Sequence, residues 1–127
     1  MEFRNCEYRK KSIKNVNNST DANIFENCCF KESKAAKLSI DKVHISNCIA
    51  ENDAFSDVDI SLGEGIHDNQ IMGCSFTNPR VFNLQIVKNM LTNNMFNNAY
   101  FSRDEIYENV ITQTKAQSLM FAGVKLN

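Results

Sequence analysis

Asp57 and Asp59 are the residues of this chain whose type and spacing come closest to acid–base chemistry. Paired carboxylates serve general acid–base catalysis and glycoside cleavage. Both residues flank Val58, which the pattern described below directs inward, so both carboxylates are expected to face solvent as surface charge. The sequence lacks a P-loop, a G-x-S-x-G and a G-x-G-x-x-G motif, and Gly63-Glu64-Gly65 is too short to cradle a phosphate. We therefore expect a protein that is not an enzyme.

Residues that commonly bind metals are present but badly spaced for a metal site. The chain has no C-x-x-C pair, and His44 and His67 lie far apart in the sequence, whereas structural zinc needs four well-placed ligands. We predict no metal and no cofactor. The odd number of cysteines and the lack of an export signal argue against a disulfide framework and indicate a reducing, cytoplasmic location. The cysteines are Cys6, Cys28, Cys29, Cys48 and Cys74.

Length and composition bound the fold that must position these residues. The 127 residues suit one domain, and an apolar fraction of 43% suffices for a hydrophobic core. No apolar run reaches the roughly 18 residues of a membrane span, so we expect no membrane association. The formal net charge of -1 excludes a wholly basic nucleic-acid binder.

The net charge conceals an uneven distribution along the chain. Residues 1–42 carry 9 basic and 6 acidic side chains, and residues 80–127 carry 5 basic and 3 acidic ones. Between them, residues 43–79 contain 6 acidic side chains and no Lys or Arg. Charges of +3, -6 and +2 therefore follow one another, and in a solenoid the middle block would form an acidic belt.

An apolar residue recurs at every fifth position from Phe25 to Ile60 and, after one inserted residue, from Ile66 to Leu126. All 21 positions of the series are apolar, which chance would give with a probability on the order of 10^-8. Five-residue steps advance about 140° on a helix and reverse the face of a strand. The chain must therefore turn a corner within every five residues, which winds it into a solenoid. The residues two before each apolar position are mostly small and share its inward face.

This pattern resembles the pentapeptide-repeat family, which has an apolar centre and a small residue two positions earlier. The resemblance covers about residues 23–127. It implies an all-β fold, a right-handed, four-sided parallel β-helix with four pentapeptides per coil and about five to six coils. A larger β-helix of the pectin-lyase kind is the alternative fold. The matching stretches are Asn27-Cys28-Cys29-Phe30, Gly73-Cys74-Ser75-Phe76, Asn98-Ala99-Tyr100-Phe101 and Gly123-Val124-Lys125-Leu126.

The repeat also predicts how the chain is divided. Residues 1–22 keep the period imperfectly and are expected to form an irregular N-terminal coil or cap, with a slip of phase through residues 15–21. Residues 23–127 form the solenoid, with a small loop near residues 61–66, where two glycines cluster. Asp53, Glu64 and Asp104 occupy inward positions that favour small residues. They either bend outward, bond a turn amide or mark local irregularity.

Solenoid ends expose apolar side chains and unpaired backbone groups unless something covers them. The resemblance implies dimers joined through such ends. Exposed apolar residues in the C-terminal repeats fit this interface, because Met90 and Val110 would stack on one side of the rod, and Tyr100 and Met120 on another. We expect a homodimer through the C-terminal coils.

The resemblance further implies a non-enzymatic, protein-binding solenoid that imitates DNA and modulates a nucleic-acid-handling protein of the topoisomerase or gyrase type. No direct binding of nucleic acid is expected. An inhibitor from a phage or mobile element that targets a bacterial nucleic-acid-guided defence complex (the anti-CRISPR type) stays open, as does a purely structural or assembly β-helix. The candidate contact residues of the acidic belt are Glu51, Asp57, Asp59, Glu64 and Asp68.

Overall fold

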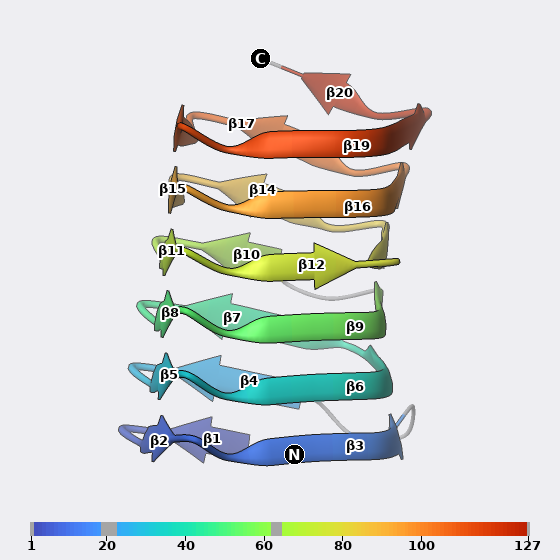
Figure 1. Cartoon of the computed structure of the whole chain (residues 1–127). Coiled ribbons are helices and arrows are strands. Elements are labelled where there is room, and N and C mark those ends of the chain that lie inside the picture. The colour runs from blue at the N-terminus through green and yellow to red at the C-terminus, as the bar shows by residue number, and fades with distance from the viewer. Residues whose placement is uncertain (1, 19–22, 62–64, 127) are drawn as a thin grey trace.

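The computed structural model describes residues 2–18, 23–61 and 65–126, which form twenty β-strands and no helix. Figure 1 shows the strands stacked in coils from the N-terminus at the bottom to the C-terminus at the top. The chain crosses the front from left to right and returns behind from right to left as it rises, which is a right-handed path. The predicted all-β solenoid is confirmed. In these ranges no helix has the length and hydropathy needed to cross a membrane.

One sheet of short parallel strands forms the first side of the rod, called side 1. Its neighbouring strands pair in register, as Phe25 does with Phe3 below and Ile45 above. The strands are β1 (Glu2–Arg4), β4 (Asn23–Glu26), β7 (Val43–Ser46), β10 (Gly65–His67), β14 (Gln85–Val87), β17 (Glu105–Tyr107) and β20 (Lys125–Leu126).

A second parallel sheet forms side 2 and contains six strands, one for each coil. It follows side 1 around every coil. The strands are β2 (Glu7–Arg9), β5 (Cys29–Lys31), β8 (Ile49–Glu51), β11 (Gln70–Met72), β15 (Met90–Thr92) and β18 (Val110–Thr112).

The third sheet bends through a corner and supplies both side 3 and side 4. In β9, for example, residues 54–56 lie on side 3, Asp57 makes the corner, and residues 59–61 lie on side 4. In the fourth coil this path is divided into two strands, and the chain's single proline, Pro79, lies between them. Proline has no N–H to donate to the ladder, which accounts for the break. The strands are β3 (Ser12–Asn18), β6 (Lys34–Asp41), β9 (Ala54–Ser61), β12 (Ser75–Thr77), β13 (Arg80–Phe82), β16 (Met95–Ser102) and β19 (Lys115–Ala122).

The register of side 1 gives the length of each coil. Ile66 pairs with Ile86, and Ile86 with Ile106, so each of these coils consists of four five-residue repeats. The coil from Phe3 to Phe25 is longer than this by two residues, and the coil from Ile45 to Ile66 is longer by one. Coils this short exclude the larger pectin-lyase kind of coil.

The two longer coils contain the residues predicted to be irregular. The phase was expected to slip through residues 15–21, yet β3 continues in register to Asn18, opposite Ile40. Register shifts by two residues between Asn18 and Asn23, and residues 19–22 lie outside the described residues. Residues 62–64 of the expected loop near 61–66 also lie outside them.

Each corner in the described ranges is made by a residue with a left-handed backbone, two positions after an apolar centre. Twenty such residues are not glycine, and their φ values lie between 51° and 60°. Nine of them are asparagine, which tolerates this conformation better than other side chains. Corner geometry therefore accounts for half of the 18 asparagines in a chain with only 4 glycines.

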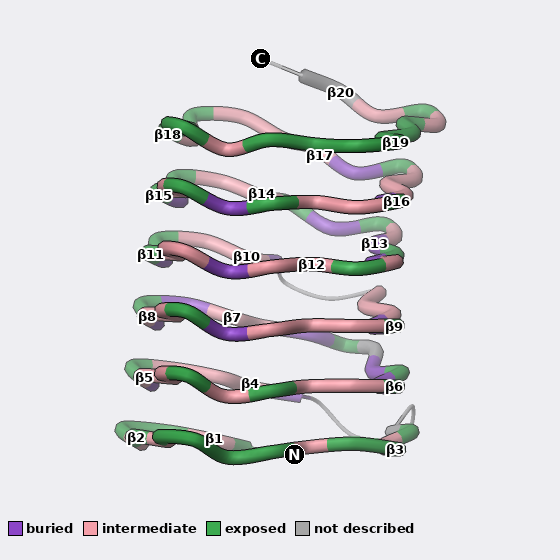
Figure 2. Tube along the Cα trace, in the orientation of Figure 1, coloured by how far each residue is buried: buried purple, intermediate pink, exposed green. Residues whose placement is uncertain are grey.

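The core consists of side chains stacked directly above one another along the rod. Phe76 lies between Phe55 and Phe96, with ring centroids 4.9 and 4.6 Å apart. Smaller inward residues such as Val43 and Cys28 fill the space beside these columns and are buried. Figure 2 shows the burial concentrated in the middle coils, with the last strands largely exposed.

Candidate functional site

The acidic belt encircles the rod instead of covering one face. Glu51 ends β8 on side 2, and Asp59 lies in β9 on side 4. Asp57 and Asp68 are corner residues with φ values of 52° and 58°. Asp57 lies between sides 3 and 4, whereas Asp68 follows β10 between sides 1 and 2. Glu64 lies outside the described residues.

Two of these carboxylates have cationic or imidazole neighbours. Lys31 Nζ lies 3.8 Å from Glu51 Oε2, and His67 Nδ1 lies 2.9 Å from Asp68 Oδ2. Surface pairs of this kind add about 0–1 kcal/mol to stability. The Lys31 ammonium group also reduces the negative potential at Glu51 on side 2.

Asp57 and Asp59 are the two belt residues that share one edge of the rod. Asn78 Nδ2 donates to Asp57 Oδ1 at 3.0 Å, and Asn98 Nδ2 donates to Asn78 Oδ1 at 2.8 Å, so Asp57 ends a corner ladder of amides. Asp59 has Arg80 as its cross-strand neighbour in the next coil. On this edge Asp59 therefore lies directly beneath an arginine, and Asp57 lies beneath Asn78.

Two other carboxylates are buried within the rod. Leu84 N donates to Asp104 Oδ1 at 2.9 Å, and Ser33 N donates to Asp53 Oδ1 at 2.8 Å. The second oxygen of each, Oδ2, is buried without a hydrogen-bond partner among the described residues. Burial raises the pKa of each carboxyl group to about 6. Of the arrangements expected from the sequence, Asp53 and Asp104 thus both adopt the one in which the carboxylate bonds a backbone amide. Glu64, for which the same expectation was made, lies outside the described residues.

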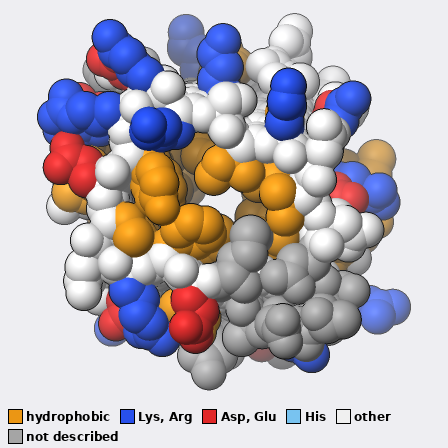
Figure 3. Space-filling model, turned by 90° about the horizontal axis from the view of Figure 1, so that it is seen from below, with side chains coloured by type: hydrophobic (Ala, Val, Ile, Leu, Met, Phe, Trp, Pro, Cys, Tyr) orange, Lys and Arg blue, Asp and Glu red, His pale blue; other side chains and the backbone are white. Residues whose placement is uncertain are grey.

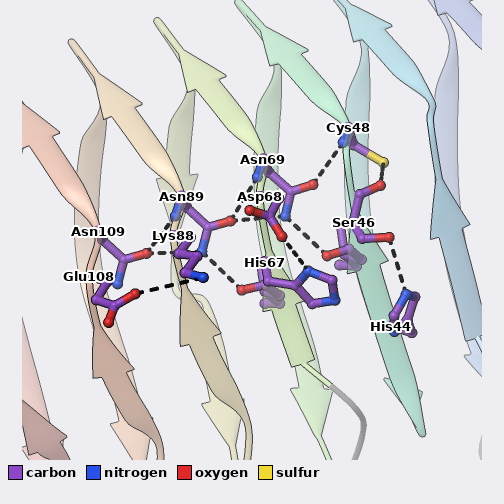
Figure 4. Close-up of polar contacts among 12 residues, drawn as sticks. His44, Ser46, Cys48, His67, Asp68, Asn69, Lys88, Asn89, Glu108 and Asn109 are labelled. Carbon is purple, nitrogen blue, oxygen red and sulfur yellow. Dashed lines mark hydrogen bonds and ion pairs between the residues drawn. The ribbon is translucent and has the colours of Figure 1, made fainter.

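Asparagines form a hydrogen-bonded column inside the same rod, shown in Figure 4. Cys48 N donates to Asn69 Oδ1 at 2.9 Å, and Asn69 N donates to Asn89 Oδ1 at 3.0 Å. Asn89 N continues the column to Asn109 Oδ1 at 2.9 Å. Each side-chain nitrogen also has a carbonyl partner, as Asn89 Nδ2 has in Ile66 O at 2.9 Å. The column ties successive coils together, and we assign it a structural role.

A shallow hollow of about 200 Å³ lies on side 1 and its corner. The T-shaped contact of His67 with His44, whose ring centroids are 5.1 Å apart, lies beside it. Ligand pockets usually measure about 300–1,000 Å³. Within the described ranges, no three His, Cys, Asp or Glu side chains come together as a cation site would require. The hollow is lined by His67, Asp68, Gln85, Val87, Lys88 and Tyr107.

The four residues expected at a dimer interface stack in two pairs. Met90 pairs in register with Val110 on side 2, and Tyr100 pairs with Met120 on side 4. Met90, Val110 and Met120 are 48%, 56% and 60% exposed. Tyr100 is half-buried because its ring packs against Phe82.

Both ends of the rod present apolar side chains. At the C-terminal end, Ile111, Leu119 and Phe121 point along the inward columns, yet they are 59%, 42% and 44% exposed. At the N-terminal end, Figure 3 shows apolar side chains around the axis and charged side chains around the rim. Phe3 and Tyr8 belong to this end, and their ring centroids are 5.8 Å apart.

Sequence reasoning missed a cluster of arginine and aromatic side chains on side 4. Arg80, Phe82 and Tyr100 come together there, directly above Asp59. The outward positions of the repeat contain the signal, because Arg80 and Tyr100 are four repeats apart and so lie on one side in neighbouring coils. Outward apolar residues were expected from the sequence only at contacts between copies.

No protein-family model matches this chain, and no curated protein matches it. Among solved structures, the chain is similar to trypsin-treated QnrB1, a plasmid-mediated fluoroquinolone resistance protein. The identity is 12% over 95% of this chain and 72% of QnrB1, with a TM-score of 0.33. A likeness of that size says nothing about function. The five-residue period, the left-handed corners and the in-register coils make this chain a right-handed, four-sided solenoid of five-residue repeats.

Proposed function

We propose that this chain is a non-enzymatic, cytoplasmic solenoid that binds another protein through its sides. The observation that carries the proposal is the composition of side 4, where the Asp57–Asp59 edge adjoins Arg80, Phe82 and Tyr100. Arginine and tyrosine are enriched among residues that dominate binding energies at protein interfaces. A flat parallel sheet that presents such side chains suits an extended protein contact better than a small substrate.

We further propose that the partner is a nucleic-acid-handling protein and that the Asp57–Asp59 edge occupies part of its basic groove. Duplex DNA carries about one negative charge per 1.7 Å of axis, and the belt concentrates charge along a short length of rod. Because Glu51 and Asp68 lie on other sides, the DNA-like contact is confined to this edge. A gyrase-type topoisomerase and a bacterial nucleic-acid-guided defence complex are both partners of this chemistry.

Charge reversal at one edge tests this proposal. The variant Asp57→Lys/Asp59→Lys should lose binding to purified gyrase or to a purified guided nuclease complex, measured by surface plasmon resonance. Asp68→Lys is the matched control, because Asp68 is also an exposed corner aspartate but lies between sides 1 and 2. Unchanged thermal melting would show that both variants remain folded. Undiminished binding by the Asp57→Lys/Asp59→Lys variant would exclude this edge as the contact.

A second candidate function is assembly through the C-terminal coils. It is favoured by the exposure of Ile111 and Phe121, which occupy inward positions yet are uncovered. A second copy seated on this end would remove their apolar surface from water. Sedimentation of Ile111→Ser/Phe121→Ser should show a monomer where the unmodified chain shows a dimer. An unchanged dimer mass would exclude these residues from the interface.

A further inference from the structure

The cluster on side 4 is an ordered arrangement of one guanidinium and two rings. Arg80 Cζ lies 5.3 Å from the centroid of the Phe82 ring, within the range of a cation–π contact. The rings of Phe82 and Tyr100 have centroids 5.8 Å apart and a tilt of 56°. These contacts hold Arg80 and Tyr100 in place before any partner arrives, which lowers the entropy cost of binding.

Two further side chains extend this cluster toward the C-terminal end. Met120 is the cross-strand neighbour of Tyr100 and is 60% exposed. Arg103 is an exposed corner residue that follows Ser102, the cross-strand neighbour of Phe82. An apolar centre is thus bracketed by two guanidinium groups.

Charge around the cluster has one sign on this part of side 4. From β13 upward, the outward residues described on side 4 include two arginines and no carboxylate, because Asp104 points inward and Glu105 lies on side 1. Among the described residues of side 4, the outward carboxylate nearest to Arg80 is that of Asp59, one coil below. An incoming negative charge is therefore favoured above Arg80 and opposed below it.

We infer that the cluster of Arg80, Phe82, Tyr100, Arg103 and Met120 binds an acidic protein segment that contains a bulky apolar side chain. The apolar side chain would pack on Tyr100 and Met120. Carboxylates on either side of it would pair with the two guanidinium groups, which bind carboxylates through parallel hydrogen bonds. The inference rests on the proposed protein-binding function but uses residues other than the Asp57–Asp59 edge.

A nucleic acid fits this surface less well than an acidic protein segment. The Phe82 ring already carries the Arg80 guanidinium and contacts the tilted Tyr100 ring, so it offers no open face for base stacking. A phosphate backbone running along the rod would also meet Asp57 and Asp59 within one coil. A short segment with a few carboxylates avoids both obstacles.

A synthetic probe tests the inference without the natural partner. A fluorescently labelled random copolymer of glutamate and tyrosine supplies carboxylates and apolar rings, whereas polyglutamate supplies carboxylates alone and oligo-dT supplies phosphates and bases. Fluorescence anisotropy should show the copolymer bound more tightly than polyglutamate or oligo-dT. Arg80→Ser/Arg103→Ser should weaken copolymer binding at least tenfold. Tyr100→Ser should remove the preference for copolymer over polyglutamate.

Two controls separate this site from the rest of the surface. Lys88→Ser removes an exposed corner cation between sides 1 and 2 and should leave copolymer binding unchanged. Asp57→Lys/Asp59→Lys should leave copolymer binding unchanged or make it tighter. The same variant should lose binding to a nucleic-acid-handling protein, so the failure of one proposal can be distinguished from the failure of the other. The inference is overturned if the folded chain does not bind the copolymer, if the arginine variant binds it equally well, or if oligo-dT binds more tightly.

Discussion

Replacing Asp104 with asparagine should stabilise the rod at neutral pH. Asp104 is 1% exposed, and Leu84 N bonds one of its oxygens while the other has no partner among the described residues. An asparagine would keep the first bond, and its Nδ2 could donate to Val81 O in the coil below. Asn109 Nδ2 makes the equivalent bond to Ile86 O at 2.9 Å. The substitution therefore removes a buried charge and supplies a hydrogen bond at the position where Asp104 Oδ2 has no partner among the described residues.

The magnitude follows from the pKa of the Asp104 carboxyl group. Burial raises this pKa from 3.8 to about 6 in the folded chain. The folded state therefore retains a proton between about pH 4 and pH 6 that the unfolded chain has released, and the free energy of unfolding falls as pH rises through that window. About two pKa units, at roughly 1.4 kcal/mol each, give Asp104→Asn a gain of about 3 kcal/mol at pH 7 and little gain at pH 4.

Urea-induced unfolding, followed by circular dichroism at about pH 4 and pH 7.5, measures both values. The matched control is the reverse change, Asn89→Asp, at an equivalent inward position in the asparagine column. It should cost a similar free energy at pH 7.5 and much less at pH 4. If Asp104→Asn changed stability equally at both pH values, or lowered it at neutral pH, the account of a charge penalised by burial would be wrong.

Three further substitutions test the corners and the core by thermal or urea unfolding. Gly65→Ala should destabilise the chain by about 2 kcal/mol or more, because a Cβ atom would lie 2.5 Å from Gln85 O at a φ of +122°; unchanged stability would contradict the close approach of these coils. Phe76→Ala should lower the free energy of unfolding by about 3–5 kcal/mol, because it removes the middle ring of a three-ring column. A loss no greater than that from truncating an exposed phenylalanine side chain would contradict the stacking. Asn93→Ala should cost about 1–2 kcal/mol at its φ of 57°, whereas Asn93→Gly should cost little or nothing; equal effects of the two changes would show that this corner is not left-handed.

The coil is predictable from sequence because the residues that define each repeat lie close together in the chain. Each inward pair, such as Cys74 and Phe76, and each corner, such as Asn78, falls within one stretch of five residues. The first coil was harder to predict, because Lys11 occupies an inward slot and Asn18 an apolar one. Its strands nevertheless align through the backbone ladder with β4, β5 and β6.

The candidate site was less predictable, because the position of a side chain around the axis depends on the coil lengths counted along the whole chain. Asp57 and Asp68 are close in the sequence, yet they lie at corners on opposite sides of the rod. The hydrogen-bond partners of the buried carboxylates could not be predicted either, because Leu84 and Asp104 are brought together only after a complete turn of the coil. Such contacts become visible only once the register is known.

The in-register stacking of the upper coils makes length a modular property of this protein. Leu84 and Asp104 occupy equivalent places one turn apart, so deleting residues 84–103 would join Asn83 to Asp104 with the same corner geometry. The rod would become shorter by one strand spacing, about 4.8 Å. Inserting one complete coil at the same point would lengthen it by one spacing. Either change moves the surfaces above the junction toward or away from the Asp57–Asp59 edge and keeps each of them on the same side of the rod, so the spacing between two surfaces can change in steps of one whole turn.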